Sequence, residues 1–380
     1  MIRKTLKFLK IDEKIKHRTL NILLNGQNEN FLVFNLNYLM STFTFIDLFA
    51  WIWWFHIAFH NLWGKLVSAI ERDKPARNTY QANFLQWNED VFLWGKFFED
   101  ITKTDPKMIP DHDILCAWFP CQAFSIAWYR KWFSDSRWNV FFDLCRIIET
   151  KKPEVIFLEN VKNLKSHDGW KTFKVIQESL ESLWYHVKAQ VLNSCEYWWI
   201  PQNRERIYIV WFRNKEAYER FSFPEKIALK LWVKDMLDKV HDSSFYYENS
   251  SLYPKLKNEI TDKNTAYQRR RQYVRANKSW VFPTLTANMW TWWHNVPLIL
   301  DAKWIRKLTP RECFRIQWFP ENFILPDMAK SQLYKQAWNA VTVPAIQRVW
   351  ECILKAINPL LSWGLLTSAN KIKHVVTTRQ

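Results

Sequence analysis

The chain has 380 residues, of which 48% are apolar, so it is long enough for one large domain and a smaller one. Lysine and arginine outnumber aspartate and glutamate by 54 to 37, and the net charge of +17 favours a polyanionic partner such as nucleic acid. The six cysteines form no CxxC pair, so the sequence indicates neither a zinc site nor a disulfide framework and fits a reducing cytoplasm.

One apolar stretch, 43–59, resembles a transmembrane segment in composition. It contains Asp47 and His56 and is only 17 residues long, which is short and polar for a bilayer crossing. We therefore expect a cytoplasmic protein without a membrane segment and without a metal.

The counts of tryptophan and glycine are unusual. The chain has 25 tryptophans and 5 glycines, whereas an average globular chain of this length has about 27 glycines. Tryptophan doublets stand beside predicted turns, at Trp53-Trp54, Trp198-Trp199 and Trp292-Trp293. We hypothesise that most of these tryptophans are glycine in the natural protein, because a UGA codon that the source reads as glycine was translated as tryptophan. The alternative is a protein that is truly rich in tryptophan.

Residues 1–39 form a basic extension that looks separate from the rest of the chain, and Met40 would make a natural start. The extension is either real or an upstream translation artefact. From Thr42 onward, short apolar runs alternate with helical patterns at 140–152 and 170–183. The runs predict strands at 43–49, 66–71, 113–117, 155–159, 186–192 and 206–210. This alternation predicts an α/β domain, 40–212, with a doubly wound, mostly parallel sheet.

The alternation ends after Phe212. Residues 213–305 are more polar and predict a second, smaller domain. Residues 306–360 are compact again and include a predicted helix at 345–357, so we expect this segment to return to the first domain. A tail follows at 361–380.

The first predicted strand leads into a turn that contains Trp51, Trp53 and Trp54, and the second strand ends at Glu71. If the tryptophans are glycine, the backbone N–H groups of the turn can approach a nucleotide-like ligand, and Glu71 can accept hydrogen bonds from a ribose. If they are tryptophan, the three indoles would instead indicate an aromatic core.

Three further motifs stand at the ends of predicted strands, and open α/β sheets bind their ligands at the carboxyl ends of the strands. Pro120-Cys121 follows 113–117, Glu159-Asn160-Val161 ends 155–159, and Arg204-Glu205-Arg206 leads into 206–210. A thiol near a carboxylate suggests acid–base chemistry, and two arginines at i and i+2 point the same way and can bind a base or a phosphate. Taken singly, each motif has an ordinary alternative: a packed thiol, a helix cap or a solvated charged edge.

The order and spacing of these motifs resemble the C5-cytosine-specific DNA methyltransferase family, of the bacterial restriction–modification type. The resemblance runs from about Thr42 to about Ile357 and includes Asp100-Ile101 and the segments 306–313, 317–320 and 336–341. The family usually has glycine at six positions that are tryptophan here, which agrees with the recoding hypothesis: Trp51, Trp53, Trp54, Trp118, Trp318 and Trp338.

The resemblance implies transfer of a methyl group from S-adenosylmethionine to carbon 5 of cytosine. Cys121 would be the nucleophile that adds to C6, and Glu159 would hold the pyrimidine at N3. Arg206 would bind the O2 oxygen, and Arg204 would orient the base or the cysteine loop. The target base must leave the duplex, because its reacting atoms are buried there.

The resemblance also implies a cofactor site across the strand ends. Phe49 would pack on the adenine, Glu71 would bind the ribose, Asp100 and Ile101 would flank the ring, and Asn339 would close the site. The remaining cofactor-binding candidates are the turn positions and the residue before the nucleophile: Trp51, Trp53, Trp54 and Pro120.

Double-stranded DNA is the implied partner of a chain that we expect to be monomeric, with a cognate restriction endonuclease possible nearby. The loop after the nucleophile would fold over DNA through Gln122, Ser125, Lys131 and Arg137. Residues 213–305 would recognise the target, with a reading loop at 283–294 that includes Thr286, Asn288, Trp292 and Trp293. A basic cluster would grip phosphates or form a solvated basic face: Arg269, Arg270, Arg271 and Arg275.

Two rival functions remain open at this point. A transfer-RNA cytosine-5 methyltransferase would use the same chemistry. A catalytically inactive DNA-binding protein is favoured if the tryptophans are genuine, because indoles would fill the cofactor space. An amino-methylating enzyme is disfavoured, because the sequence has no Asp/Asn-Pro-Pro-aromatic motif.

Overall fold

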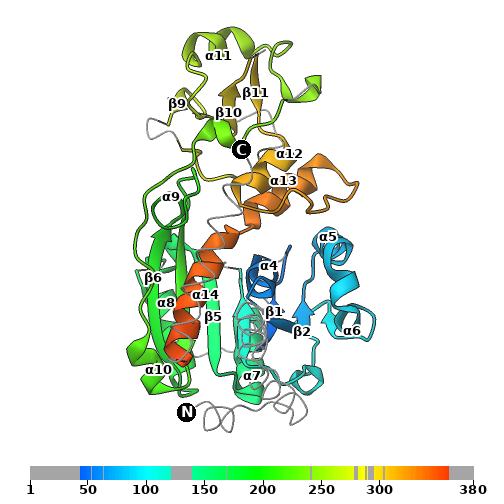
Figure 1. Ribbon diagram of the computed structural model, residues 1–380, viewed down its shortest axis with the longest axis vertical. Coiled ribbons are helices and arrows are strands. Elements are labelled where there is room, and N and C mark those ends of the chain that lie inside the picture. Colours follow the sequence, from blue (N-terminus) through cyan, green and yellow to red (C-terminus); the bar gives the residue numbers. More distant parts are fainter. Residues whose placement is uncertain are drawn as a thin grey trace, which may run out of the picture.

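The computed structural model describes residues 43–52, 54–62, 64–120, 139–167, 169–239, 242–277, 281–286, 289, 295–302 and 304–358 (Figure 1). The predicted extension 1–39 and tail 361–380 lie outside these ranges.

A seven-stranded sheet forms the large lobe. Its strand order is β3-β2-β1-β4-β5-β7-β6, and β7 alone runs antiparallel to its neighbours. The strands are β1 (Thr44–Leu48), β2 (Lys65–Ile70), β3 (Phe97–Phe98), β4 (Ile114–Ala117), β5 (Val155–Val161), β6 (His186–Asn193) and β7 (Glu205–Phe212). The predicted mostly parallel sheet is therefore confirmed, and all six predicted strands are present; only the two-residue β3 was not predicted.

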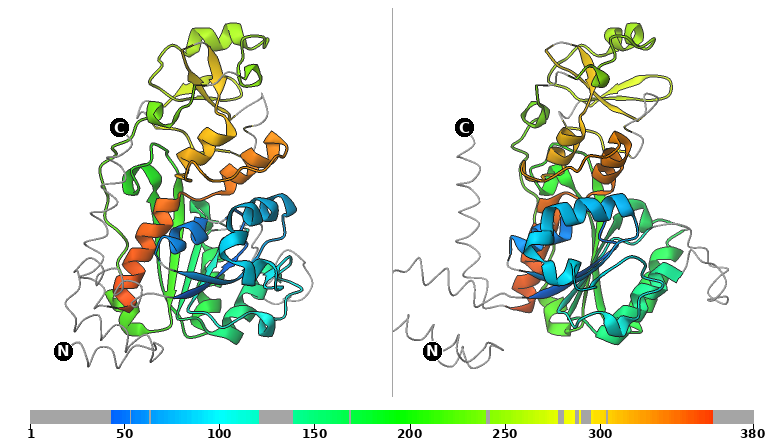
Figure 2. Two further views of the ribbon diagram at one scale, coloured as in Figure 1. Left: turned by 45° about the vertical axis from the view of Figure 1, so that its right-hand side comes forward. Right: turned by 90° about the vertical axis from the view of Figure 1, so that its right-hand side faces the viewer.

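Helices cover both faces of this sheet, as a doubly wound fold requires (Figure 2). On one face, α7 (Asn139–Lys151) and α8 (Lys171–Glu181) bury apolar side chains such as Leu144 and Ile176 against the strands. On the other face, α4 (Trp54–His60), α5 (Lys74–Phe84) and α14 (Val343–Ile357) do the same. The helices predicted at 140–152, 170–183 and 345–357 are confirmed within two residues at each end.

The β4 and β5 strands are apolar on both faces because both are covered. Every residue of β4 is buried, and so is each residue of β5 up to Asn160. Continuous apolar runs are typical of central parallel strands, and here they keep the sheet rigid beneath the polar residues at its edge.

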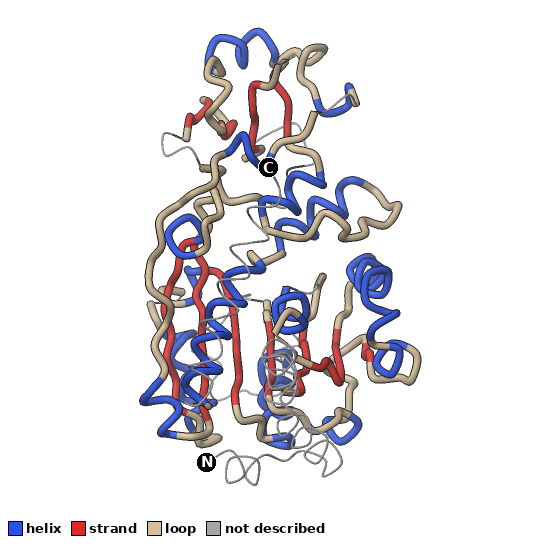
Figure 3. The backbone as a smooth tube through the Cα atoms, viewed as in Figure 1, coloured by secondary structure: helices blue, strands red, loops and turns tan. Residues whose placement is uncertain are grey.

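A second, four-stranded antiparallel sheet lies in the smaller lobe, apart from the large one (Figure 3). Its order is β11-β10-β8-β9, and its strands are β8 (Tyr267–Arg269), β9 (Val274–Ala276), β10 (Pro297–Leu300) and β11 (Ile305–Lys307). A small core that includes Tyr247, Leu256 on α11 (Tyr253–Glu259) and Leu298 supports it.

Two helices, α12 (Pro310–Ile316) and α13 (Lys330–Asn339), connect the small lobe to α14. The remaining helices are short: α6 (Glu89–Phe92), α9 (Ser194–Tyr197) and α10 (Lys215–Arg220), with 3-10 turns at Leu85–Trp87, Pro106–Met108, Lys162–Leu164, Val233–Met236 and Ser243–Phe245. Within the described ranges, the helices are all too short or too polar to cross a membrane.

Several tryptophans have left-handed backbone conformations, which favour glycine. Eight described residues other than glycine have positive φ angles, and five of these are tryptophan: Trp51, Trp170, Trp184, Trp199 and Trp318.

Candidate active site

The ends of β4 and β5 are joined by a side chain. Asn160 is fully buried, and its Nδ2 donates a hydrogen bond of 2.8 Å to the carbonyl oxygen of Phe119. Pro120 follows and is exposed. Cys121, the predicted nucleophile, lies outside the described residues, but the chain that leads to it is held beside the end of β5.

Glu159 and Arg206 form a buried ion pair between β5 and β7. Arg206 Nε lies 3.1 Å from Glu159 Oε1, and the side chains are 7% and 0% exposed. Because Val161 is paired with Arg206 and Glu159 with Tyr208, the two charges meet diagonally on one face of the sheet. Neither Glu159 oxygen accepts a hydrogen bond within the described part of the chain, so beyond the ion pair at Oε1 the carboxyl group keeps acceptor capacity for a ligand.

Burial raises the pKa of Glu159 to about 7, although the charges of Arg206 and Arg204 lower it. A carboxyl group with a pKa near neutrality can both hold and release a proton at physiological pH, as general acid–base chemistry requires. Burial also lowers the pKa of Arg206 from its usual value.

Arg204 lies beside this pair but bonds elsewhere. Its side chain is buried, and Nη2 donates to the carbonyl oxygens of Trp338 and Ala340 at 2.8 and 2.5 Å. Its Nε and Nη1 have no hydrogen-bond partner among the described residues. The indole of Trp338 lies over the guanidinium groups of both Arg204 and Arg206, 5.7 and 5.6 Å from the ring centroid.

The turn after β1 is held by Glu71. Its Oε2 accepts a hydrogen bond of 2.7 Å from the backbone N–H of Trp51, and its Oε1 accepts one of 2.6 Å from that of Asp73. Burial raises the pKa of Glu71, while these backbone hydrogen bonds lower it. The predicted turn and the predicted acidic residue are therefore in contact, although the ribose-binding role of Glu71 stays a prediction.

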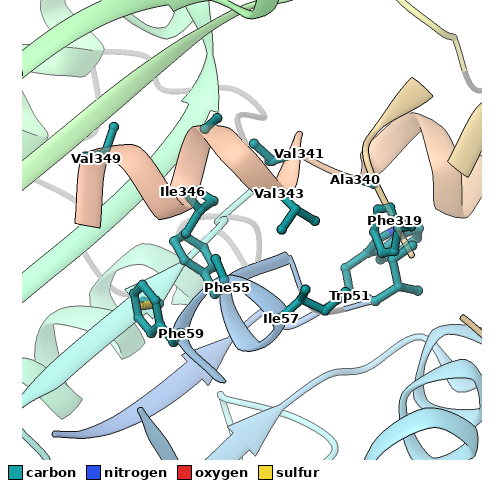
Figure 4. Close-up of a cluster of buried hydrophobic side chains, with 14 of the residues drawn as sticks. Trp51, Phe55, Ile57, Phe59, Phe319, Ala340, Val341, Val343, Ile346 and Val349 are labelled. Carbon is teal, nitrogen blue, oxygen red and sulfur yellow. The ribbon is translucent and has the colours of Figure 1, made fainter. Parts of the chain in front are cut away.

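Helix α13 closes this turn from the far end of the chain. Trp51 Nε1 donates to the carbonyl oxygen of Gln336 at 3.2 Å, and Thr79 Oγ1 donates to Gln336 Oε1 at 3.0 Å. Lys335 Nζ binds Asp73 Oδ2 at 2.6 Å and lies over the Trp51 ring. Figure 4 shows Trp51 close to Phe319 and Ala340, with Val343 and Ile346 of α14 packed toward α4.

The other predicted cofactor residues lie at the same edge. Phe49 is half-buried directly after β1, Asp100 follows β3 and accepts two hydrogen bonds from Thr102, and Ile101 is buried. Asn339 is the last residue of α13 and is half-buried. Their contacts with a cofactor stay predictions.

Sequence reasoning assigned no role to three residues of this region: Asp47, Lys335 and Gln336. Asp47 is a fully buried carboxyl group in β1, and burial, followed by repulsion from Glu71, raises its pKa well above the usual value. The signal was a single acidic residue in an apolar strand that ends at the ligand-binding edge. Gln336 begins the segment 336–341 of the family resemblance, whereas Lys335 carries no signal, because polar residues are ordinary on a helix.

The small lobe contains the predicted DNA-binding residues that are described. Arg271 and Arg275 are exposed on the β8–β9 hairpin; Arg269 is half-buried, and Arg270 Nη1 binds Asn295 Oδ1 at 2.9 Å. Thr286 is half-buried and donates to the carbonyl oxygen of Asn295 at 3.2 Å.

The base of the predicted reading loop is attached to the arginine segment. The backbone N–H of Asn203 donates to the carbonyl oxygen of Phe282 at 2.8 Å, and Thr284 Oγ1 donates to that of Asn203 at 2.6 Å. The two predicted binding regions are therefore in contact.

Several predicted site residues lie outside the described residues: Trp53, Cys121, Gln122, Ser125, Lys131, Arg137, Asn288, Trp292 and Trp293. The side chain of Trp54 does too. Among the residues that are described, no group of three or more His, Cys, Asp or Glu could hold a metal ion.

A Rossmann-like sheet with a single antiparallel strand, a turn held by a strand-end carboxylate and a buried Glu–Arg pair defines the class of the S-adenosylmethionine-dependent methyltransferase fold. Residues 43–355 match the model of the C-5 cytosine-specific DNA methylase family, and the chain belongs to that family of enzymes.

Similar curated proteins are type II methyltransferases. The chain is 51% identical over 298 residues to type II methyltransferase M.Bsp6I from Bacillus sp. (strain RFL6), covering 77% of this chain and 92% of that one. It is 37% identical to type II methyltransferase M.HhaI from Haemophilus parahaemolyticus, over 83% and 95% of the two chains. The crystal structure of S. pombe Dnmt2 methyltransferase is similar in fold, with a TM-score of 0.65 at 19% identity over 83% and 99%.

Proposed function

We propose that this chain is the methyltransferase of a type II restriction–modification system. It transfers a methyl group from S-adenosylmethionine to C5 of a flipped-out cytosine in a short specific duplex sequence, through a covalent bond between Cys121 and C6. The observation that carries the proposal is the buried Glu159: it is ion-paired with Arg206 at 3.1 Å, accepts no hydrogen bond from the described residues and lies beside the strand end that leads to Cys121.

The chemistry follows from the electron demand of the base. C5 of cytosine is a weak nucleophile, so the thiolate of Cys121 adds to C6 and pushes the electron pair of the C5–C6 double bond toward C5. Glu159, with a pKa near 7, donates a proton to N3 and so accepts the charge that the ring would otherwise carry. Arg206 binds O2. C5 would take the methyl group and leave S-adenosylhomocysteine. A base would then remove the C5 proton as elimination breaks the C6–S bond and frees the Cys121 thiolate, and the N3 proton would return to Glu159.

The residues around the first turn fit S-adenosylmethionine. Glu71 and Asp100 follow β2 and β3, where carboxylates can accept hydrogen bonds from ribose hydroxyls and an adenine amino group, and Phe49 offers an aromatic face. When bound there, the group supplies an electrophilic methyl on a sulfonium. Trp51, Trp53, Trp54, Ile101, Pro120 and Asn339 complete the proposed cofactor site.

DNA would lie between the lobes. The residues 213–305 would form the target-recognition domain, and Arg271 and Arg275 are exposed for phosphate contacts. The reading loop begins where Phe282 and Thr284 form hydrogen bonds with Asn203. The proposed reading loop is therefore attached to the segment that carries Arg204 and Arg206. The other proposed DNA contacts are Gln122, Ser125, Lys131, Arg137, Arg269, Arg270, Thr286, Asn288, Trp292 and Trp293. We propose a cytoplasmic monomer, with a cognate endonuclease encoded nearby.

One observation favours a second candidate, a catalytically inactive DNA-binding protein. If Trp338 is genuine, its indole covers the guanidinium groups of Arg204 and Arg206, where the base must enter. This candidate predicts DNA binding without methyl transfer.

Bisulfite sequencing tests the proposal. DNA from cells that express the gene with glycine at the tryptophan codons should contain protected cytosines within one short sequence. A parallel assay compares methyl incorporation into duplex DNA and into transfer RNA, and we expect DNA alone to be labelled. Unmodified cytosines throughout the DNA, despite soluble protein, would refute the proposed DNA methyltransferase. Labelled transfer RNA would instead support a transfer-RNA cytosine-5 methyltransferase.

A further inference from the structure

Residues 336–340 connect the two halves of the site. At one end, Gln336 accepts a hydrogen bond from Thr79 of α5, and Lys335 binds Asp73, whose backbone is bonded to Glu71 beside the turn that follows β1. At the other end, the carbonyl oxygens of Trp338 and Ala340 both accept hydrogen bonds from Arg204. Asn339 lies between these two carbonyl groups, so its backbone is fixed from both sides.

We infer that Arg204 is a positioning residue for the cofactor rather than a group that binds the base. Its hydrogen bonds hold the backbone of residues 338–340, which includes Asn339, beside the turn that follows β1. The inference rests on the proposed function, because it needs a cofactor beside Asn339.

The geometry explains why an arginine is used. One terminal nitrogen of Arg204 reaches two carbonyl oxygens, at 2.8 and 2.5 Å, in a site where the side chain is only 1% exposed. Hydrogen bonds from a charged donor are about twice as strong as neutral ones, and a guanidinium group reaches them in a fixed plane that a lysine ammonium cannot reproduce. The acceptors are backbone groups, so the contact does not depend on the side chain at position 338.

Arg206 provides the matched comparison. It comes two residues later in the same strand region and is also buried, yet its Nε faces Glu159 rather than the 338–340 turn. Substituting Arg204 should therefore weaken cofactor binding, whereas substituting Arg206 should weaken contact with the target base and lower kcat.

The test measures binding of S-adenosylhomocysteine by calorimetry, without DNA, to the natural protein and to R204K and R206K. We expect R204K to raise the Kd at least 10-fold and R206K to change it less than 3-fold, while R206K lowers kcat. Thermal melting shows whether R204K is folded. An unchanged Kd in folded R204K, or an equal rise in Kd in R206K, would overturn this inference but not the proposed function. If the natural protein did not bind S-adenosylhomocysteine at all, the proposed function would be refuted instead.

A second pair of variants keeps the test decisive if R204K does not fold. T79V removes the hydroxyl that donates to Gln336 at 3.0 Å, whereas T79S keeps it. We expect T79V to raise the Kd several-fold with little change in kcat at saturating cofactor, and T79S to bind as the natural protein does. Equal Kd values for T79V and T79S would contradict the role of this segment.

The left-handed tryptophans carry a second, independent inference. Trp184 follows α8, where its N–H donates to Glu181 O at 2.9 Å and that of Tyr185 donates to Leu180 O at 3.3 Å. This pair of bonds is the Schellman motif, whose left-handed residue is usually glycine. Here that residue is Trp184, with φ of 66° and 85% of its side chain exposed.

Trp318 repeats the arrangement after α12. Its N–H donates to Arg315 O at 2.8 Å, and that of Phe319 donates to Phe314 O at 3.1 Å. The rings of Phe314 and Phe319 are 5.2 Å apart, which is the apolar contact that accompanies this motif. The left-handed backbone at position 318 is thus fixed by contacts that do not involve the side chain of residue 318, and this conformation favours glycine.

We propose that the natural protein carries glycine at the five left-handed tryptophan positions, namely 51, 170, 184, 199 and 318. A left-handed conformation is unfavourable for a residue with a Cβ atom. At 170, 184, 199 and 318 the indole is also 37–85% exposed and gains little from packing in return, whereas Trp51 is buried and its case rests on the backbone conformation alone. Decoding of a UGA codon as glycine accounts for all five positions at once.

Peptide mass spectrometry of the protein from its own source tests this directly. Glycine at the five positions is expected, and tryptophan there would overturn the inference. Substitutions in the tryptophan-containing chain give a second test: W184G should raise Tm by about 2 °C. W94G is the control, because Trp94 is 76% exposed but has no positive φ, and it should give no increase. A lower Tm for W184G, or an equal rise for W94G, would contradict the argument from backbone strain.

Discussion

The side-chain amide of Asn160 donates a hydrogen bond of 2.8 Å to the carbonyl oxygen of Phe119, and so joins the end of β5 to the segment that leads to Cys121. Glu159 is the residue before Asn160, so one short sequence at the end of β5 both supplies the buried carboxylate and fixes the approach to the thiol. The relative position of nucleophile and acid should therefore depend on Asn160.

Replacing Asn160 by alanine should slow catalysis as well as reduce stability. The variant loses one buried hydrogen bond, which costs about 1–3 kcal/mol of unfolding free energy. We expect kcat to fall at least about 10-fold, because small displacements of reacting groups are costly. Steady-state kinetics and urea denaturation measure the two effects. Asn163 is exposed on the next turn, and N163A is the control that should change neither; an unaltered kcat in N160A would show that this contact does not position the nucleophile.

The stability of the protein should depend on pH through Glu159. Its pKa is raised to about 7 in the folded state, largely by burial, while an unfolded glutamate titrates near its usual value of about 4.3. Between these values the folded state binds more protons, so the stabilising contribution is complete below the lower pKa and is lost as pH rises toward 7. The unfolding free energy of the natural protein should therefore fall relative to that of E159Q between about pH 4.5 and 7, and the difference should be constant above pH 8.

Urea denaturation at half-unit pH steps gives this comparison. Curves for the natural protein and E159Q that stay parallel across the range would mean that Glu159 is ionised in the folded state at all these pH values. E159Q should also lose most methyl transfer, because its amide cannot donate an acidic proton to N3.

Glu71 should control cofactor affinity through the backbone of the first turn. Its two oxygens accept hydrogen bonds from the N–H groups of Trp51 and Asp73, and the amide of E71Q can accept only through one oxygen. A charge-assisted hydrogen bond contributes about 1.5–3 kcal/mol, so we expect the Kd for S-adenosylhomocysteine to rise at least about 10-fold. Calorimetry measures it, with the exposed E178Q on α8 as the control. Unchanged affinity in E71Q would remove Glu71 from the cofactor site.

The sheet could be predicted from the sequence because its strands are apolar runs of four to eight residues, such as β5 at Val155–Val161. The strands β8 to β11 have only three or four residues each, too few for an alternating pattern to appear, so the prediction of a second domain at 213–305 rests on composition alone.

The candidate site was predictable only in part, for a related reason. Glu159 and Arg206 stand at the ends of recognisable strands, so their meeting follows from topology. The contacts of Arg204 with residues 134 and 136 positions away involve carbonyl oxygens, which every residue has, and no side-chain pattern marks them.

The junction between the two lobes depends on a buried ion pair. Arg306 donates to both oxygens of Glu312 at 2.8 and 2.7 Å and to Asp301 at 2.8 Å, and Arg306 and Glu312 are both fully buried. E312Q leaves Arg306 with Asp301 as its one remaining charged partner among the described residues, so it should lower the unfolding free energy by about 1–3 kcal/mol. Glu321, whose side chain is 43% exposed, pairs with Arg315, and E321Q should cost less than about 1 kcal/mol. Urea denaturation compares the two, and equal losses would be evidence against the buried pair.

Methyl transfer by the Cys121→Ser variant tests the central claim most directly. Tritiated methyl incorporation into duplex DNA should fall at least about 1000-fold relative to the unsubstituted enzyme, because the hydroxyl of serine is a far weaker nucleophile toward C6, while binding of S-adenosylhomocysteine should be unchanged. Incorporation at an undiminished rate would contradict the covalent mechanism and the role assigned to this residue.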